Sequence, residues 1–320
     1  MIKKLTILSV ALLLGVFSYG QQIPQYSQYM INDYILNPSI TGMHDYFEVK
    51  SNNRIQWVGI NDAPRTFLLS VHGPIQKMNM GLGGAIFSDV TGPTSRTGAY
   101  LSYAYHLKLS PSLKLGMGLS MGLLQFRIDG TQITLRDDGD VALGNYVQTV
   151  YTADATFGFN LYHKDFSVGF SAPQIIGNKL KFYENQEATR SSLARHFMLM
   201  GSYTFHVGDD INIQPSVLLK YVSPTPLQID GGVKFSYREM VWLGATYRHD
   251  DAVSIVAGYT HKNFVMFAYS YDIPMSNLSN YSSGTHEVMI GVRFKPNKKN
   301  KSEDAMPKGP APDTEGAESK

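Results

Sequence analysis

The sequence predicts an all-β fold, a transmembrane antiparallel β-barrel of about 14 strands with short periplasmic turns and longer extracellular loops. The clearest evidence is the stretch 112–124, in which small or charged residues alternate with Leu113, Leu115, Met117, Leu119, Met121 and Leu123. Such a strand has a large apolar face for lipid and a small polar face for the lumen. The second observation is that the connections after even-numbered strands are mostly tight, whereas all the long connections follow odd-numbered strands. The third is a composition of 20 Tyr, 16 Phe and 29 Gly with 17% charged residues, which suits aromatic girdles and tight turns.

The N-terminus predicts export. Lys3 and Lys4 precede an apolar run over 5–17, and Ser18-Tyr19-Gly20 is a small-residue cleavage site, so residues 1–20 are expected to be a signal peptide. The chain has no cysteine, which excludes disulfides and thiolate metal sites. A net charge of +2 does not favour nucleic acid as a partner. No other segment has the roughly 18 consecutive apolar residues of a membrane helix.

Period-two alternation recurs along the chain and predicts a barrel over 46–294. The expected strands are 46–57, 65–73, 80–88, 97–109, 112–126, 150–162, 165–171, 195–207, 210–222, 228–237, 240–249, 252–261, 263–272 and 284–294. Their apolar faces are expected to contact outer-membrane lipid.

The connections between these strands are of two kinds. Those after even-numbered strands are mostly tight, whereas the other set contains the long ones, 127–149, 172–194 and 273–283. This asymmetry is typical of outer-membrane barrels with periplasmic turns, and an even strand count places both termini in the periplasm. Residues 295–320 lack periodicity and are expected to be a disordered periplasmic tail.

Residues 21–45 are polar and aromatic but do not alternate, so they are difficult to explain as lipid-facing wall. They are expected to form a separate N-terminal segment, at the periplasmic face or inside the lumen as a plug. A plug or docking role and a loose linker both remain open.

Catalytic and metal-binding patterns are weak. Gly118-Leu-Ser-Met-Gly122 matches G-x-S-x-G, but it lies inside a regular strand instead of the sharp turn that exposes a nucleophilic serine, so no enzyme is predicted. The nine histidines form no ligand pattern, and no metal or cofactor is expected. Inward cations could select anions in a pore or could pair internally; they are Lys108, Lys114, Lys220, Lys234 and Arg238.

The N-terminal quarter carries the most specific motifs. They are Pro24-Gln-Tyr26-Ser-Gln28-Tyr29-Met, Asn37-Pro38-Ser-Ile-Thr-Gly42, Arg54-Ile-Gln-Trp57-Val-Gly59, Ala63-Pro-Arg-Thr66, Ser70-Val-His72-Gly-Pro74, Gly81-Leu-Gly-Gly84 and Tyr103-Ala-Tyr-His106. In this order they resemble the opening blocks of the PorP/SprF family of Bacteroidetes membrane proteins. Ser39-Ile-Thr41 departs mildly from the small residues more frequent in that family.

The resemblance implies a non-enzymatic outer-membrane barrel of the Gram-negative type IX secretion and gliding-motility system. Family members support secretion or surface attachment of a large secreted adhesin, and one branch associates with periplasmic ring or motor components. A passive or selective channel is the alternative. The partner-binding or plug residues suggested by the motifs are Tyr26, Gln28, Tyr29, Asn37, Pro38, Arg54, Trp57 and His72. Trp57 could equally be an interfacial girdle residue.

Overall fold

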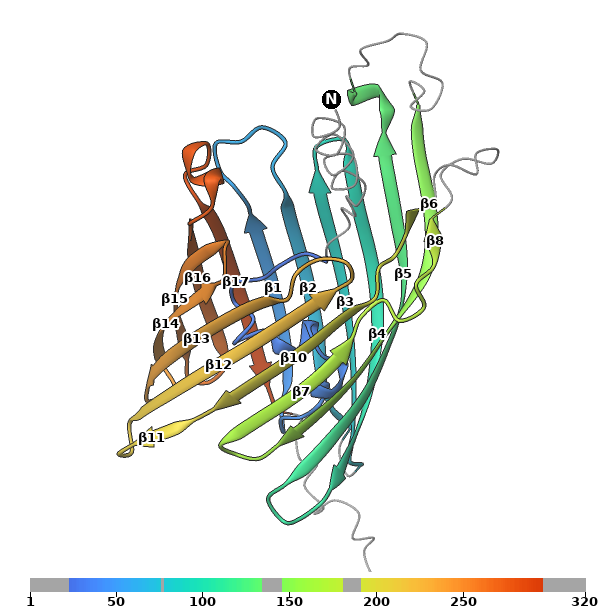
Figure 1. Ribbon diagram of the computed structural model, residues 1–320. Coiled ribbons are helices and arrows are strands. Elements are labelled where there is room, and N and C mark those ends of the chain that lie inside the picture. Colours follow the sequence, from blue (N-terminus) through green and yellow to red (C-terminus); the bar gives the residue numbers. More distant parts are fainter. Residues whose placement is uncertain (1–22, 76–77, 134–145, 181–190, 296–320) are drawn as a thin grey trace, which may run out of the picture.

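The computed structural model describes residues 23–75, 78–133, 146–180 and 191–295, and its strands close into one antiparallel barrel (Figure 1). The wall strands are β1 (Phe47–Ile55), β2 (Arg65–Ile75), β3 (Met80–Thr91), β4 (Thr94–Lys108), β5 (Lys114–Asp129), β6 (Val147–Tyr162), β7 (Phe166–Ala172), β10 (His196–Tyr203), β11 (Phe205–Val207), β12 (Ile211–Val222), β13 (Gln228–Tyr237), β14 (Val241–Arg248), β15 (Ala252–His261), β16 (Val265–Pro274) and β17 (Thr285–Phe294). The predicted signal peptide and C-terminal tail lie outside the described residues, apart from Lys295.

Each wall strand pairs with its neighbours in the sequence, and β17 returns to pair with β1 along all nine residues of β1. The short β11 and the longer β10 both pair with β12, so together they occupy one position in the wall. The prediction of a closed antiparallel barrel of 14 strands is therefore confirmed.

The structure differs from the predicted elements in detail. The strand expected over 195–207 is interrupted at Thr204, which separates β10 from β11. Within the loop expected over 172–194, β8 (Lys179–Leu180) pairs with β9 (Ser191–Ser192). The 3-10 helices are η1 (Asp33–Ile35), η2 (Pro38–Ile40), η3 (Gly130–Gln132) and η5 (Asn277–Asn280). No helix in the described part of the chain is long and apolar enough to cross a membrane.

The two faces of β5 are those that the alternation predicts. Leu119, Met121 and Leu123 are 40%, 62% and 68% exposed on the outer surface, whereas Ser120 is 6% exposed and faces the lumen. Gly118 and Ser120 are thus ordinary inward residues in the middle of a strand. The G-x-S-x-G match has no turn to expose a nucleophile.

The barrel has two distinct ends. At the turn end, short connections follow β2, β4, β6, β11, β13 and β15. The first strand, β1, begins at this end, and the last strand, β17, finishes there. Arg238 and Glu239 form such a turn, both with positive φ, and Arg238 is exposed beside Asp210 with Nε 2.8 Å from Oδ1. The prediction that Arg238 faces the lumen was wrong, because β13 ends one residue earlier. The longer connections lie at the opposite end, the loop end.

Candidate functional site

An N-terminal segment, residues 23–44, fills the barrel lumen and is called the lumen segment below (Figure 1). Ile23 lines cavities shared with Gln174 and Thr225, which belong to the loop end. His44 lines a cavity shared with Pro111 and Lys164, which belong to the turn end. The lumen segment therefore crosses the barrel from the loop end to the turn end. The expected periplasmic location of both termini stays a prediction, because residues 1–22 and 296–320 lie outside the described residues.

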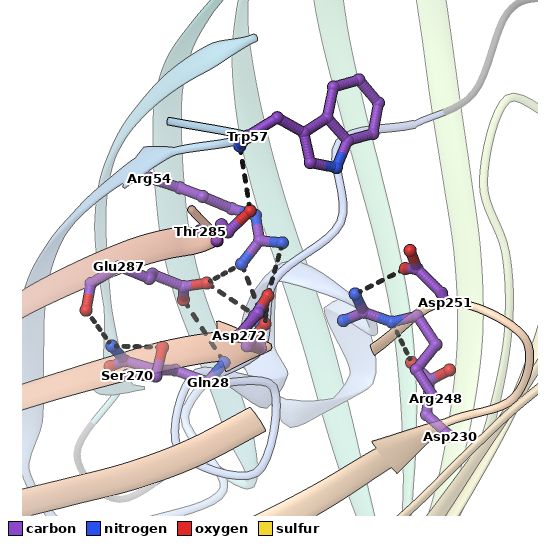
Figure 2. A network of polar contacts seen from close by, with 12 residues as sticks. Gln28, Arg54, Trp57, Asp230, Arg248, Asp251, Ser270, Asp272, Thr285 and Glu287 are labelled. Atoms are coloured by element: carbon purple, nitrogen blue, oxygen red, sulfur yellow. Dashed lines mark hydrogen bonds and ion pairs between the residues drawn. The ribbon is translucent and has the colours of Figure 1, made fainter. Parts of the chain in front are cut away.

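The lumen segment meets a buried ion-pair network at the seam between the first and last strands (Figure 2). Arg54 of β1 faces Glu287, its register partner on β17, with Nη1 2.9 Å from Oε2, and its Nη2 lies 2.8 Å from Asp272 Oδ2 on β16. Ser27 of the lumen segment contacts each of these three side chains. Its amide donates to Glu287, and its hydroxyl donates to Asp272 and accepts from Arg54 Nη1 at 2.8 Å. Each of these residues is at most 3% exposed, so one guanidinium and two carboxylates pair in a buried site, where their mutual attraction and hydrogen bonds offset the cost of desolvation.

Gln28 ties the lumen segment to the same seam. Its amide nitrogen Nε2 donates to the Glu287 carbonyl at 2.8 Å and to Ser270 Oγ at 3.4 Å. Asn52 Nδ2 of β1 donates to Glu287 Oε1 at 2.8 Å. A second cluster lies beside the first, where Arg248 reaches Asp230 and Asp251 (Figure 2).

Asn37 holds the middle of the lumen segment. Its Oδ1 accepts from the Ser39 amide at 3.0 Å and caps η2, in which Pro38 is the first residue. Its Nδ2 donates to the backbone carbonyls of Phe159 on β6 and Phe170 on β7, at 2.9 and 3.3 Å. A side-chain amide offers both functions at once, which explains asparagine at this position.

Inward glycines make room for this stretch. A Cβ added to Gly158 would lie 2.0 Å from Asn37 Oδ1, one added to Gly118 would lie 2.2 Å from the Ser39 nitrogen, and one added to Gly81 would lie 2.1 Å from the Thr41 carbonyl oxygen. Real Cβ contacts are never this close, so the wall and the lumen segment fit only because these positions lack side chains.

His72 and Tyr34 stack with ring centroids 4.5 Å apart, and His72 also faces Glu48 with Nε2 3.5 Å from Oε2. The Tyr34 hydroxyl lies 3.0 Å from Ser102 Oγ. His106 binds the Thr41 carbonyl oxygen through Nε2 at 2.9 Å. These contacts hold the half of the lumen segment nearer the turn end.

Tyr26 and Tyr29 occupy the half nearer the loop end. Tyr26 is 8% exposed and packs in an apolar cluster with Leu68, Phe87 and Leu124. The Tyr29 hydroxyl lies 3.4 Å from Ser216 Oγ. Cavities of about 90 and 260 Å³ lie beside these two tyrosines.

The structure thus brings seven of the eight motif residues together at the lumen wall or in the lumen segment. Trp57 is the exception: it lies in the β1–β2 connection with a φ of 46°, and its indole points away from the Arg54 network (Figure 2). Its amide donates to Thr285 Oγ1 at 3.1 Å. The motif analysis missed Ser27, Asp272 and Glu287 as site residues; the signal for the latter two was an acidic residue on an inward strand face.

No group of three or more His, Asp or Glu side chains that could hold a metal ion occurs in the described part of the chain. The buried acidic residues of the Arg54 network instead face arginine and amide donors.

A closed strand ladder with an apolar outer face and a filled polar lumen defines a plugged β-barrel of the outer membrane. The chain belongs to the PorP/SprF family, because the family described as "Type IX secretion system membrane protein PorP/SprF" matches residues 18–292. The resemblance noted in the N-terminal motifs is thereby confirmed, and the protein is a type IX secretion membrane protein.

Solved structures of similar fold are outer-membrane proteins. The toluene transporter TbuX of Ralstonia pickettii has a TM-score of 0.52 at 10% identity, covering 82% of this chain and 93% of that one. A FadL homologue of Pseudomonas aeruginosa has a TM-score of 0.49 at 10% identity, covering 86% and 95%. At these identities TbuX supports the barrel fold alone. A search of curated proteins found no match.

Replacing Asn37 with aspartate is expected to loosen the lumen segment. An anionic oxygen would then face the Phe159 and Phe170 carbonyls, which lose their donor at a cost of about 1–3 kcal/mol. Hydrogen exchange measured by mass spectrometry should show the amides of residues 39–42 exchanging roughly tenfold faster or more. Asn280→Asp, on an exposed residue of η5, is the control. Unchanged protection in Asn37→Asp would show that these bonds do not hold the segment.

Proposed function

We propose that this protein is a non-enzymatic, non-conducting scaffold that supports secretion or surface attachment of a partner adhesin in the type IX secretion and gliding-motility system. The observation that carries the proposal is the lumen segment, which fills the barrel and is fixed to its wall at Ser27, Gln28 and Asn37. A barrel filled in this way presents surfaces to other proteins more readily than it passes solutes. Membership of the family supports the secretion role.

We further propose that the turn end faces the periplasm and the loop end faces the cell exterior, as in other outer-membrane barrels. Lys295 then emerges on the periplasmic side, where the secretion machinery and ring or motor components would be met. Ile23 lies below the outer mouth, beside Gln174 and Thr225 of the loops that an adhesin would contact.

A passive or selective channel is the second candidate. It is favoured by one observation, a polar cavity of about 610 Å³ at the turn end of the lumen. The lumen segment separates this cavity from the two at the loop end, since Met30 and Ile31 line the former while Ile23 and Pro24 line the latter.

Conductance across planar bilayers distinguishes the two candidates. The wild-type protein is expected to be silent, whereas Gly118→Val should conduct, because its Cβ would lie 2.2 Å from the Ser39 nitrogen and displace the lumen segment. Valine favours strand structure, so the wall itself should form. In cells carrying the same variant, surface labelling of the partner adhesin should fall.

Gly231→Val is the matched control, since an added Cβ at this β13 position meets no heavy atom within 4 Å. It should remain silent and display the adhesin normally. A conducting wild-type protein would favour the channel. Normal adhesin display in a conducting Gly118→Val variant would separate the secretion role from the lumen segment.

A further inference from the structure

The turn end of the lumen contains a cavity with an excess of positive charge. Five basic side chains line it against three acidic ones, Asp33, Glu48 and Asp165. The basic residues are Lys50, Lys114, Lys164, Lys234 and Arg293. The cavity has a volume of about 610 Å³, which is large enough for several side chains of a peptide.

Two of the three carboxylates in this cavity, Glu48 and Asp165, are engaged in ion pairs, whereas Asp33 forms none within the described residues. Glu48 lies 2.6 Å from Lys50 Nζ through Oε2 and 2.7 Å from Arg293 Nε through Oε1. Asp165 lies 3.1 Å from His206 Nε2 through Oδ1, and its Oδ2 is 4.0 Å from Lys164 Nζ. Lys50 also donates to the Ile31 carbonyl of the lumen segment.

Two lysines are left over. Within the described residues, neither Lys114 nor Lys234 has a carboxylate within ion-pair distance, and the ammonium of Lys114 lies only over the Tyr162 ring, 5.9 Å from its centroid. Both side chains are half-buried at the cavity wall. Asp33 lines the same cavity but forms no ion pair with either lysine. A half-buried ammonium without a carboxylate in contact is costly, and an incoming anion that pairs with it would reduce that cost.

We propose that this cavity binds an acidic peptide segment of another protein, whose carboxylates pair with Lys114 and Lys234. A peptide fits better than a lipid headgroup, because the cavity opens inside the ring of strands and not toward the lipid-facing surface. Tyr46, Tyr162 and Phe166 add aromatic surface against which a peptide can pack. The inference goes beyond the scaffold function and holds for either outcome of the conductance measurement.

The test uses the full-length protein in non-ionic detergent and a fluorescent peptide of six glutamates, with binding followed by anisotropy at low ionic strength. Wild-type protein should bind hexaglutamate and not hexalysine. The double variant Lys114→Gln, Lys234→Gln should bind at least about tenfold more weakly, because it loses two charge-assisted contacts. Arginine at both positions should preserve binding. None of these substitutions removes an ion pair of the folded protein, so the barrel should remain intact.

Lys262→Gln is the matched control, since Lys262 is exposed in the β15–β16 turn at the same end and lies outside the cavity lining. It should bind hexaglutamate as the wild type does. Equal affinity of the double variant and Lys262→Gln would overturn the site. Displacement of hexaglutamate by inorganic phosphate at equal concentration would overturn the assignment to a peptide.

Discussion

Replacing Arg54 with alanine is expected to destabilise the barrel by about 3–5 kcal/mol, the usual cost of removing one partner from a buried ion pair. The loss would leave Asp272 and Glu287 facing each other with no cation, and both are at most 3% exposed. Ser27 would lose one of its contacts at the same time. The free energy of unfolding, measured by urea titration in lipid vesicles, should fall accordingly.

The control is Arg127→Ala. Arg127 also pairs with a carboxylate, Asp129, but its side chain is 49% exposed and the atoms are 3.5 Å apart. Exposed pairs of this kind contribute about 0–1 kcal/mol. Similar losses in the two variants would mean that water reaches the Arg54 network.

Leu119→Arg is expected to cost about 2–4 kcal/mol, because it places a charge near the bilayer midplane. Leu119 is central in the apolar row of β5, between Tyr103 on β4 and Phe157 on β6, and its side chain faces outward. The measurement is the same urea titration, together with the fraction of protein that keeps its heat-resistant folded form in electrophoresis.

Gln125→Arg provides the comparison on the same strand and face. Gln125 lies next to Arg127 beyond the apolar row, where an arginine costs about 0–1 kcal/mol. The difference between the two variants therefore measures depth in the membrane. If both were equally stable, the apolar row of β5 would not face lipid.

Much of the wall could be predicted from the sequence because the side-chain period of a strand is a local property. The alternation of the neighbouring residues predicts that Leu119 faces outward and Ser120 faces inward. A shift of one residue would move every side chain of the strand to the opposite face. The interruption at Thr204 and the short β8–β9 ladder could not be predicted in this way. Neither changes the alternation of the residues around it.

The contacts inside the lumen were harder to predict from the sequence. Arg54 and Glu287 are 233 residues apart, and they meet only because the first and last strands pair in one particular register. The motifs marked Asn37 and Gln28 as unusual, but not the carbonyls and carboxylate that they bind. Trp57 belongs to the same motif block as Arg54, although only Arg54 reaches the lumen, because the chain leaves the sheet at Ile55.

The crossing of the lumen by residues 23–44 has a consequence for how the ring forms. A closed cylinder of hydrogen-bonded strands has no lateral opening. A chain that runs through it must therefore be enclosed when the cylinder closes, or be threaded through afterwards by its free end. Gln28 binds the Glu287 carbonyl on the last strand, at the place where the ring is completed. We therefore expect enclosure: in the wild-type chain the final strand arrives and the inner chain is trapped in one event.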